Sequence, residues 1–526
     1  MSGWHTRFKE RLALGGEPVF VLDFQSPDLF GSDYLSEFRY TLYSHSAPDV
    51  RGHIPDAIRR VSGAGQRVNV RSWTSSMGGI RVELASTDVA QFVAMTIPRG
   101  SVAELRIGFE GFTLDQYETC GVYSFRGLSG SRNNWTMDLV DAFTLMQTPD
   151  KVALSAQFYK EAGATTKEVT GSTWHVGDAT LEVSGATTTD FPRDTSSGAR
   201  GLLYCQPVHD GNDPFYLKFT GLTGNDFDIA NSNVIGTTRA NLHATDPVTI
   251  IGYVHDSPPD VAQMLLFGGL AGASTMPTNW HMNLNYSSHL VNRSDFNSWR
   301  SRWLAFYTDF NGDFIVSEPI ENAYRALEEY LSAFGSWLVF KEGGLSWRFV
   351  QDMERADIAE YVITDADIVS EDGYQLHNQD APVEFFQVRY PSATNDDGGK
   401  VSTRPGQFRY DHPSRSRVYN DDVVTTNTTN AFLNMKERLT PWYTRIPDQL
   451  SLTLKGWRYA ELCPGDVVSI ESNYLYDMIN GFDFISYTEG GMDRHHRGTQ
   501  YMVTGVDVNW SGFSVSVQLS TFPNHT

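Results

Sequence analysis

Cysteine is scarce in this 526-residue sequence, and the three cysteines, Cys120, Cys205 and Cys463, lie far apart. No two of them have the CxxC spacing, and their number is odd, so neither a disulfide framework nor a zinc ribbon is indicated. This usage of cysteine disfavours a secreted multidomain β-protein.

Long apolar runs are also missing. No segment approaches the roughly 20 apolar residues of a membrane-spanning helix, and the first 16 residues, MSGWHTRFKERLALGG, lack the apolar centre of a signal peptide. We therefore expect synthesis in a cytoplasm and no stable membrane insertion.

The sequence has few basic residues relative to acidic ones. The 41 lysines and arginines stand against 63 aspartates and glutamates, which gives a formal net charge of −22. A chain this acidic lacks the basic footprint that grips a phosphate backbone. Like charges repel, so the same surface is compatible with a passage that nucleic acid crosses without sticking.

The usual catalytic motifs are absent as well. The sequence has no GxSxG elbow, HExxH motif, Walker loop or GxGxxG after a strand. Neighbouring carboxylates do occur, but a glycosidase needs two of them across a cleft, which proximity in sequence does not show. We predict no enzyme, no cofactor and no catalytic, cofactor-binding or metal residues. The carboxylate pairs are Glu328–Glu329, Asp365 with Asp367, Glu371–Asp372, Asp396–Asp397 and Asp421–Asp422.

Two short stretches invite a metal interpretation. Asp309, Asn311 and Asp313 alternate as in a calcium loop, but such a loop needs Gly at its sixth place and Glu at its twelfth, and neither stands there. A hairpin turn around Asn311 and Gly312 is favoured instead. The neighbours His495 and His496 would point to opposite faces of a strand, so their segment is predicted to be a loop tip that contacts a partner.

The stretch LCPGDVVSI (462–470) places a thiol beside a carboxylate. Cys463 would act as a nucleophile only with a histidine base nearby and a lowered pKa. Pro464, Gly465 and Asp466 are common turn residues, so we favour a turn that feeds a strand, with Cys463 as a small, semi-buried apolar residue.

Short alternating segments dominate the chain and predict a mainly β fold. In the N-terminal part we expect strands at 18–24, 67–73, 80–85 and 103–109, followed by a long hairpin around SGSRN (129–133). In the C-terminal part the expected strands are 383–391, 449–457, 466–472, 500–510 and 512–521, with one helix around 430–442.

The middle of the chain has a different pattern. PPDVAQMLLFGGLAG, from residue 258, has prolines suited to a first helical turn and glycines suited to a stop. Residues 318–335 carry apolar side chains every three or four positions and end at Gly335, which predicts an amphipathic helix. Two strands around Glu342-Gly343-Gly344 should follow and complete a compact α/β unit.

These patterns divide the chain into two β-barrel-like end domains, a small β module and an α/β helix–hairpin unit. The predicted boundaries are 1–146 for the N-terminal barrel-like domain, 147–255 for the small β-rich inserted module, 256–360 for the helix–hairpin unit and 361–526 for the C-terminal barrel-like domain.

Four stretches together resemble the tail hub (tail-tip or baseplate hub) proteins of long-tailed bacteriophages. They are 174–251, with its "GT…A…H…V" run; 260–350, a helix, a tryptophan-bearing linker, a Glu-Pro helix start and a hairpin; the "pGD-v-i" turn and strand at 462–470; and the paired strands at 501–521. The resemblance covers about two thirds of the chain and rests mainly on the shared order of these stretches.

The resemblance implies a structural virion protein at the distal end of the tail, synthesised in the bacterial host cytoplasm. Such hubs form homotrimers, in which two barrel-like, tail-tube-like domains per subunit match the six-fold tail tube. The implied partners are the chain itself, the tail tube or distal tail protein, the tape measure protein, tip or fibre proteins, and passing DNA without specific binding. A carbohydrate-binding or polysaccharide-degrading tail protein stays open as an alternative, because the sequence has 12 Trp, 24 Tyr and abundant Asp.

Overall fold

Strands are the main secondary structure of the computed structural model, and four helices of 10 to 14 residues accompany them in its described residues. The predicted mainly β class is confirmed. The described residues are single positions at 8, 10, 11, 14, 143, 439, 442 and 512 and the ranges 17–24, 40–46, 52–63, 65–70, 72–132, 134–141, 166–185, 201–212, 215–235, 240–267, 291–307, 312–316, 323–350, 361–375, 385–388, 408–409, 416–419, 449–472, 476–477, 482–483, 488–489, 492–493, 500–510 and 514–522.

An eight-stranded sheet, here the N-terminal sheet, forms the first part of the fold. Its strand order is β3-β2-β1-β8-β9-β10-β7-β4. The strands predicted at 18–24, 80–85 and 103–109 and the long hairpin around 129–133 all belong to it. Its strands are β1 (Val19–Phe24), β2 (Tyr40–Tyr43), β3 (His53–Ile54), β4 (Ile58–Gly63), β7 (Ile80–Leu84), β8 (Val102–Gly108), β9 (Glu118–Ser131) and β10 (Asn134–Asp141).

The two edges of this sheet are joined by a very short link. The edge strands β3 and β4 are separated only by residues 55–57, which reach at most about 14 Å. A flat sheet of eight strands is about 34 Å wide, so the sheet must curl until its edges approach each other. Ala57 bonds both sides, because its N–H donates to Tyr43 (2.7 Å) and its carbonyl accepts from Ala85 (3.0 Å).

The C-terminal sheet curls in the same way. Its strands follow the order β20-β26-β31-β32-β25-β21, and its edge strands β20 and β21 are joined by residues 365–367. No sheet in the described residues is closed into a barrel by strand pairing, so the two end sheets are curled but open. The strands are β20 (Tyr361–Thr364), β21 (Ile368–Gln375), β25 (Gln449–Lys455), β26 (Val467–Glu471), β31 (Gln500–Asn509) and β32 (Ser514–Thr521).

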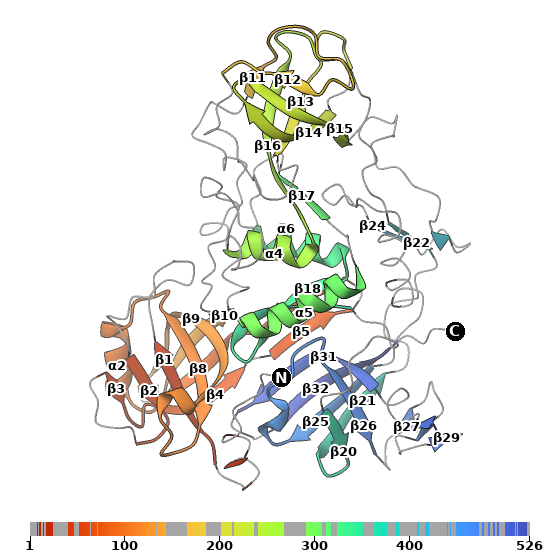
Figure 1. Ribbon diagram of the computed structural model, residues 1–526. Helices are drawn as coiled ribbons and strands as arrows, with labels where there is room; N and C mark the ends of the chain where they lie inside the picture. Colours follow the sequence, from red (N-terminus) through yellow and green to blue (C-terminus); the bar gives the residue numbers. More distant parts are fainter. Residues whose placement is uncertain are drawn as a thin grey trace.

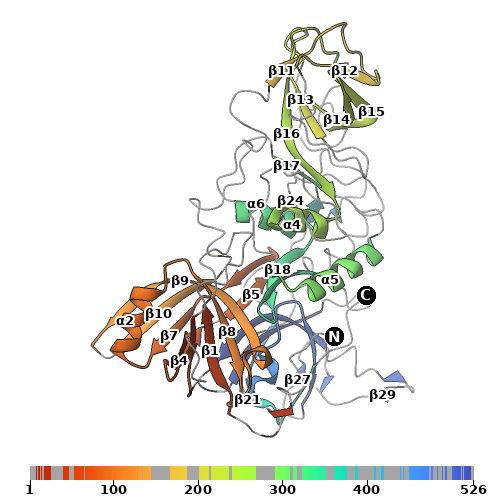
Figure 2. The same cartoon turned by 60° about the vertical axis from the view of Figure 1, so that its left-hand side comes forward.

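A single long hairpin belongs to both end sheets. Beyond β4 the chain continues as β5 (Gly65–Asn69), returns as β6 (Thr74–Met77) and enters β7. β4 and β7 lie in the N-terminal sheet, whereas β5 pairs antiparallel with β31 of the C-terminal sheet. Figure 1 and Figure 2 both show β5 reaching from the orange sheet toward the blue one.

The two end sheets also share one hydrophobic core. Leu22 and Leu105 of the N-terminal sheet and Leu452 and Val517 of the C-terminal sheet are buried in the same cluster. This arrangement makes the two ends of the chain one packed body, although the predicted domain boundaries themselves stay a prediction.

A small β module lies at the far end of the molecule from the two end sheets (Figure 1). It has its own core, and its strand β16 runs on toward the helices, where β17 (Gly312–Val316) pairs with it. Its strands are β11 (Thr166–Glu168), β12 (Thr180–Glu182), β13 (Gly201–Cys205), β14 (Phe215–Thr223), β15 (Asp226–Ile235) and β16 (Pro247–Asp256).

The helix–hairpin unit lies between the module and the end sheets. The predicted helix from residue 258 is α4 (Pro258–Phe267), and the predicted amphipathic helix is α6 (Ala323–Ala333), which gives way at Gly335 with a φ of +62°. The predicted hairpin is β18 (Ser336–Lys341) and β19 (Gly344–Phe349). Glu342 and Gly343 between them both have positive φ (51° and 74°), as a tight type I′ turn requires.

Two helices were not predicted. α2 (Thr87–Thr96) begins at Ser86, whose side chain accepts the Val89 N–H at 3.2 Å. α5 (Arg293–Phe306) occupies the stretch that the sequence analysis treats as a linker, and it directly precedes Asp309 to Asp313. The predicted hairpin turn around Asn311 and Gly312 is therefore wrong, because a helix precedes it and Gly312 begins a strand that pairs with β16.

Several predictions fall wholly or partly outside the described residues. His495, His496 and the pairs Asp396–Asp397 and Asp421–Asp422 are among them. The helix expected over 430–442 is described only at Leu439 and Trp442, which are helical. None of the described helices has the length and apolar character needed to cross a membrane.

Candidate functional site at the junction of the end sheets and the helix–hairpin unit

The junction defined here consists of the β5–β6 limb (65–77), the β18–β19 hairpin (336–349) and the turn at 462–466. Their buried side chains share a second hydrophobic core with α4, α5 and α6. These three segments are far apart in sequence and come from the N-terminal sheet, the helix–hairpin unit and the C-terminal sheet. Their contacts at the junction therefore fix the positions of these parts relative to one another.

Glycine allows the long hairpin to bend from one sheet into the other. Gly63 has a φ of +93°, and a Cβ there would lie 2.5 Å from the carbonyl oxygen of Gly79. A Cβ on Gly79 would in turn lie 2.4 Å from the carbonyl oxygen of Leu139. Such approaches are closer than any side chain tolerates, so the bend requires glycine at both positions.

The tip of the β5–β6 limb is anchored by aromatic packing. Trp73 is fully buried and stacks on Trp337 of β18 with ring centroids 5.5 Å apart, while Trp442 meets it edge-on at 5.3 Å. Trp73 adopts a positive φ of 54°, which is unusual for a bulky residue. The packing around the ring holds the backbone in this conformation.

A side-chain amide joins β5 to β18. The Gln66 Nε2 donates to the Phe340 carbonyl oxygen at 3.0 Å, and the Phe340 N–H donates to the Gln66 Oε1 at the same distance. The amide therefore reproduces the pair of hydrogen bonds that a neighbouring strand would make. It ties the limb from the N-terminal sheet to the helix–hairpin unit.

The stretch LCPGDVVSI is a tight turn that begins β26, as predicted. Asp466 accepts the Cys463 N–H through its carboxylate at 3.0 Å and donates its own N–H to the Cys463 carbonyl at 3.1 Å. Gly465 has a φ of +103° and donates to the Val503 carbonyl at 2.8 Å, which connects the turn to β31. The predicted semi-burial of Cys463 is wrong in degree, because the side chain is fully buried.

A buried ion cluster surrounds this turn. The Lys341 Nζ donates to Asp466 at 2.6 Å, and the guanidinium of Arg348 contacts Asp466 at 3.5 Å and Asp295 at 2.5 Å. Asp295 belongs to the first turn of α5 and also accepts the hydroxyl of Ser346. Two positive and two negative groups thus balance one another among α5, β18, β19 and the turn.

Burial and pairing set the pKa values in this cluster. Burial disfavours ionisation of Asp466, but Lys341 and Arg348 outweigh it and hold the pKa of Asp466 below its ordinary value. Burial likewise opposes the charge on Lys341, yet Asp466 leads to a net rise in the pKa of that ammonium. Asp466 and Lys341 therefore both stay charged at neutral pH.

Cys463 is not an activated thiol. Burial raises its pKa well above the ordinary value, although the positive charges of Arg348 and Lys341 act in the opposite direction. Its sulfur accepts from Arg348 at 3.3 Å, and the cluster contains no imidazole that would take its proton. The arrangement supplies cohesion between elements rather than a nucleophile.

The two carboxylate pairs whose side chains the structure describes, Glu328–Glu329 and Asp365 with Asp367, lie on different elements and do not form one site. Glu329 is exposed and pairs with Arg325, and Asp367 caps the turn between β20 and β21 by accepting the Thr364 N–H at 2.9 Å. Within the described residues, no group of three or more His, Cys, Asp or Glu side chains is placed to hold a metal ion. Lys341 and Arg348 were missed because a strand sequence gives no sign that its charged residues are buried.

No protein-family model and no curated protein matches the sequence. Similar solved structures include the 43 kDa tail protein of prophage MuSo2 from Shewanella oneidensis, with 10% identity over 69% of this chain and 94% of that one and a TM-score of 0.23. A lidless PdpA–VgrG complex has 9% identity, coverage of 97% and 66%, and a TM-score of 0.31. A p2 virion baseplate in its activated conformation has 9% identity, coverage of 97% and 100%, and a TM-score of 0.24. Likeness at this level establishes neither a common fold nor a common function.

Proposed function

We propose that this chain is a structural virion protein, the homotrimeric hub of a long-tailed phage, which closes the distal end of the tail tube. The observation that carries the proposal is that each chain holds two curled sheets in a fixed relation through one shared hairpin. Three copies would present six such sheets, one for each subunit in a ring of a six-fold tube. The trimer itself has three-fold symmetry, which a three-fold tip can bind.

The junction supplies the stiffness that this role needs. A hub transmits force between tube and tip, so its two sheets must not swing independently. The shared hairpin, the common core and the neutral ion cluster each join elements that are distant in sequence. Opening for DNA passage would then occur between subunits or in other parts of the chain, while the paired sheets move as one body.

The charge of the chain suits contact with passing DNA. Each copy carries a formal −22, so a ring of three presents an acidic wall to a phosphate backbone. We propose the tail tube or distal tail protein, the tape measure protein and tip or fibre proteins as stable partners. DNA would pass without specific binding.

The mass and shape of the purified full-length chain test this proposal. Light scattering should give a trimer, and negative-stain images should show a ring with a central lumen. Antibodies against the chain should label one end of the tail in virions of the phage that encodes it. A monomer that forms no ring and is absent from virions would refute the hub.

The carbohydrate alternative gains little from the structure. Eight of the 12 tryptophans are buried and therefore do not form a platform for sugars: Trp73, Trp174, Trp299, Trp303, Trp337, Trp347, Trp442 and Trp510. A screen on host polysaccharides separates the two proposals. Release of reducing ends, or retention on glycans, would favour the alternative.

A further inference from the structure

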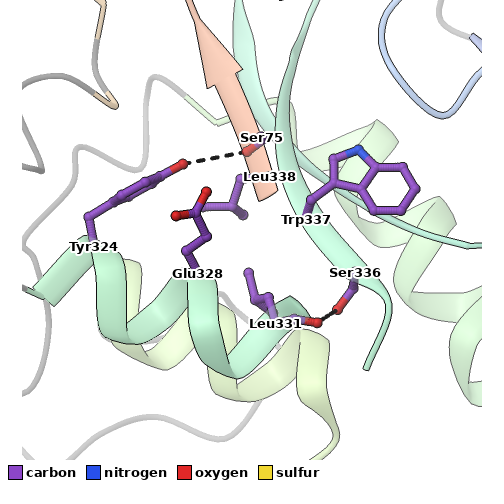
Figure 3. A pocket seen from close by; sticks show the side chains of 7 residues that line it. All are labelled: Ser75, Tyr324, Glu328, Leu331, Ser336, Trp337 and Leu338. Carbon is purple, nitrogen blue, oxygen red and sulfur yellow. Dashed lines mark hydrogen bonds between the residues drawn. The ribbon is translucent and has the colours of Figure 1, made fainter. Parts of the chain in front are cut away.

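A small cavity lies where the β5–β6 limb meets the helix–hairpin unit. Figure 3 shows it enclosed by α6, β18 and β6. Its volume is about 10 Å³, the scale of one water molecule. The lining residues are Ser75, Tyr324, Glu328, Leu331, Ser336, Trp337 and Leu338.

Ser75 is the polar link between β6 and α6. Its hydroxyl lies 3.4 Å from the Tyr324 hydroxyl, and it lines the same cavity as Glu328. Ser75 and Tyr324 are buried, and Glu328 is partly buried. The limb from the N-terminal sheet therefore meets α6 at Ser75, which contacts the Tyr324 hydroxyl and shares the cavity with Glu328.

The surroundings of Glu328 offer little compensation for a negative charge. On its own helix, Arg325 pairs with Glu329 at 2.9 Å, and both of these side chains are largely exposed. The cavity residues that β6 and β18 contribute are uncharged. Burial is the main reason that the pKa of Glu328 rises to about 7, with a smaller contribution from Glu329, while the Ser75 N–H and Arg325 act in the opposite direction.

We propose that the contact between α6 and β6 is a proton-controlled latch, in which neutral Glu328 keeps the β5–β6 limb docked and ionised Glu328 loosens it. Ionisation places a charge beside Leu331, Leu338 and the Tyr324 ring, and separation of β6 from α6 lets water solvate that charge. The latch would regulate how tightly the two end sheets are held to the helix–hairpin unit. It does not depend on the hub assignment, because it concerns the single chain.

The direction of the pH effect follows from the two states. The docked state holds the Glu328 proton up to about pH 7, whereas an undocked, solvated glutamate loses it near its ordinary value of about 4.3. The free energy of docking is thus most favourable below about pH 4.3 and becomes less favourable between pH 4.3 and 7. Above about pH 7 it stays at its weakest value and no longer changes with pH. From pH 5.5 to 8.5 the full shift would raise the opening equilibrium about 30-fold. Partial solvent exposure of the carboxyl reduces this to roughly tenfold.

Hydrogen exchange of the full-length chain tests the latch. Exchange at residues 74–77, corrected for the intrinsic pH dependence of amide exchange, should speed up roughly tenfold between pH 5.5 and 8.5. Glu328→Gln should abolish this rise and keep slow exchange throughout. Glu329→Gln, a matched change of the exposed neighbour, should behave as the unmodified chain does.

Two results would overturn the proposal. One is an unmodified chain whose corrected exchange at 74–77 does not change with pH. The other is a Glu328→Gln variant that retains the rise. Because glutamine keeps the size of the side chain and removes only the charge, the variant should fold, and Glu328→Met provides a second uncharged variant with the same expected result.

Discussion

Replacing Asp466 by asparagine tests whether the buried ion cluster holds the junction together. Asparagine keeps an oxygen that accepts the Cys463 N–H, so the turn survives and only the charge is removed. Lys341 would then lose its partner at 2.6 Å, and Arg348 would keep Asp295 as its carboxylate partner, while both cations stay almost fully buried. Breaking one side of such a pair costs about 3–5 kcal/mol, because an uncompensated charge is left inside.

Hydrogen exchange at residues 336–349 measures this loss as a change in the local free energy of opening, which suits a chain with several cores better than one global transition. The matched control is Asp507→Asn on β31, whose partner Arg67 is 55% exposed and whose own side chain is 45% exposed. That pair should contribute no more than about 1 kcal/mol. If Asp466→Asn lowers the local free energy of opening by less than about 1 kcal/mol, water or rearrangement compensates the charge on Lys341, which has lost its partner, and the reasoning is refuted.

Three further substitutions probe the turn and the bend, and an acid titration probes the charge on Asp466. Cys463→Ser should leave folding and assembly intact, and loss of function in a folded, fully assembled variant would return the thiol to consideration. Gly465→Val should destabilise the junction by about 3 kcal/mol, since φ is +103° and a Cβ would lie 3.0 Å from the Trp337 ring; equal stability in urea unfolding would contradict this. Gly63→Ala should cost about 2 kcal/mol and loosen β5 from β31, seen as faster exchange at 65–69. The depressed pKa of Asp466 predicts stability that is present above about pH 4 and lost as the pH falls further, and an acid titration of Asp466→Asn should show a smaller loss.

The strands were predictable because alternation leaves a strong local signal. Ile80, Val82 and Leu84 are buried while Arg81 between them is exposed, and this pattern is legible in the sequence. α5 also left a signal, since Phe296, Trp299 and Trp303 recur every three or four residues and are all buried. It was overlooked because Trp299 and Trp303 were assigned to a linker.

The junction was not predictable for a physical reason. Lys341 and Asp466 are 125 residues apart, and Gln66 and Phe340 are 274 apart, so no local pattern connects them. The curling of the two sheets follows from the order in which their strands pair. Given that order, the short links at 55–57 and 365–367 require each sheet to curl, but the sequence alone does not give the order.

The shared hairpin has a consequence for how the chain is made. β5 pairs with β31, and Arg67 and Asp507, which form an ion pair across this contact, are separated by 440 residues. A ribosome therefore releases the β5–β6 limb long before its partner strand exists. Until β31 is synthesised, one edge of the limb stays unpaired, and this exposed edge makes nascent chains vulnerable to misassembly. The pairing of β5 with β31 is therefore a late and slow folding step. Truncated products that end before residue 500 should fail to bury this limb, and host chaperones would meet it first.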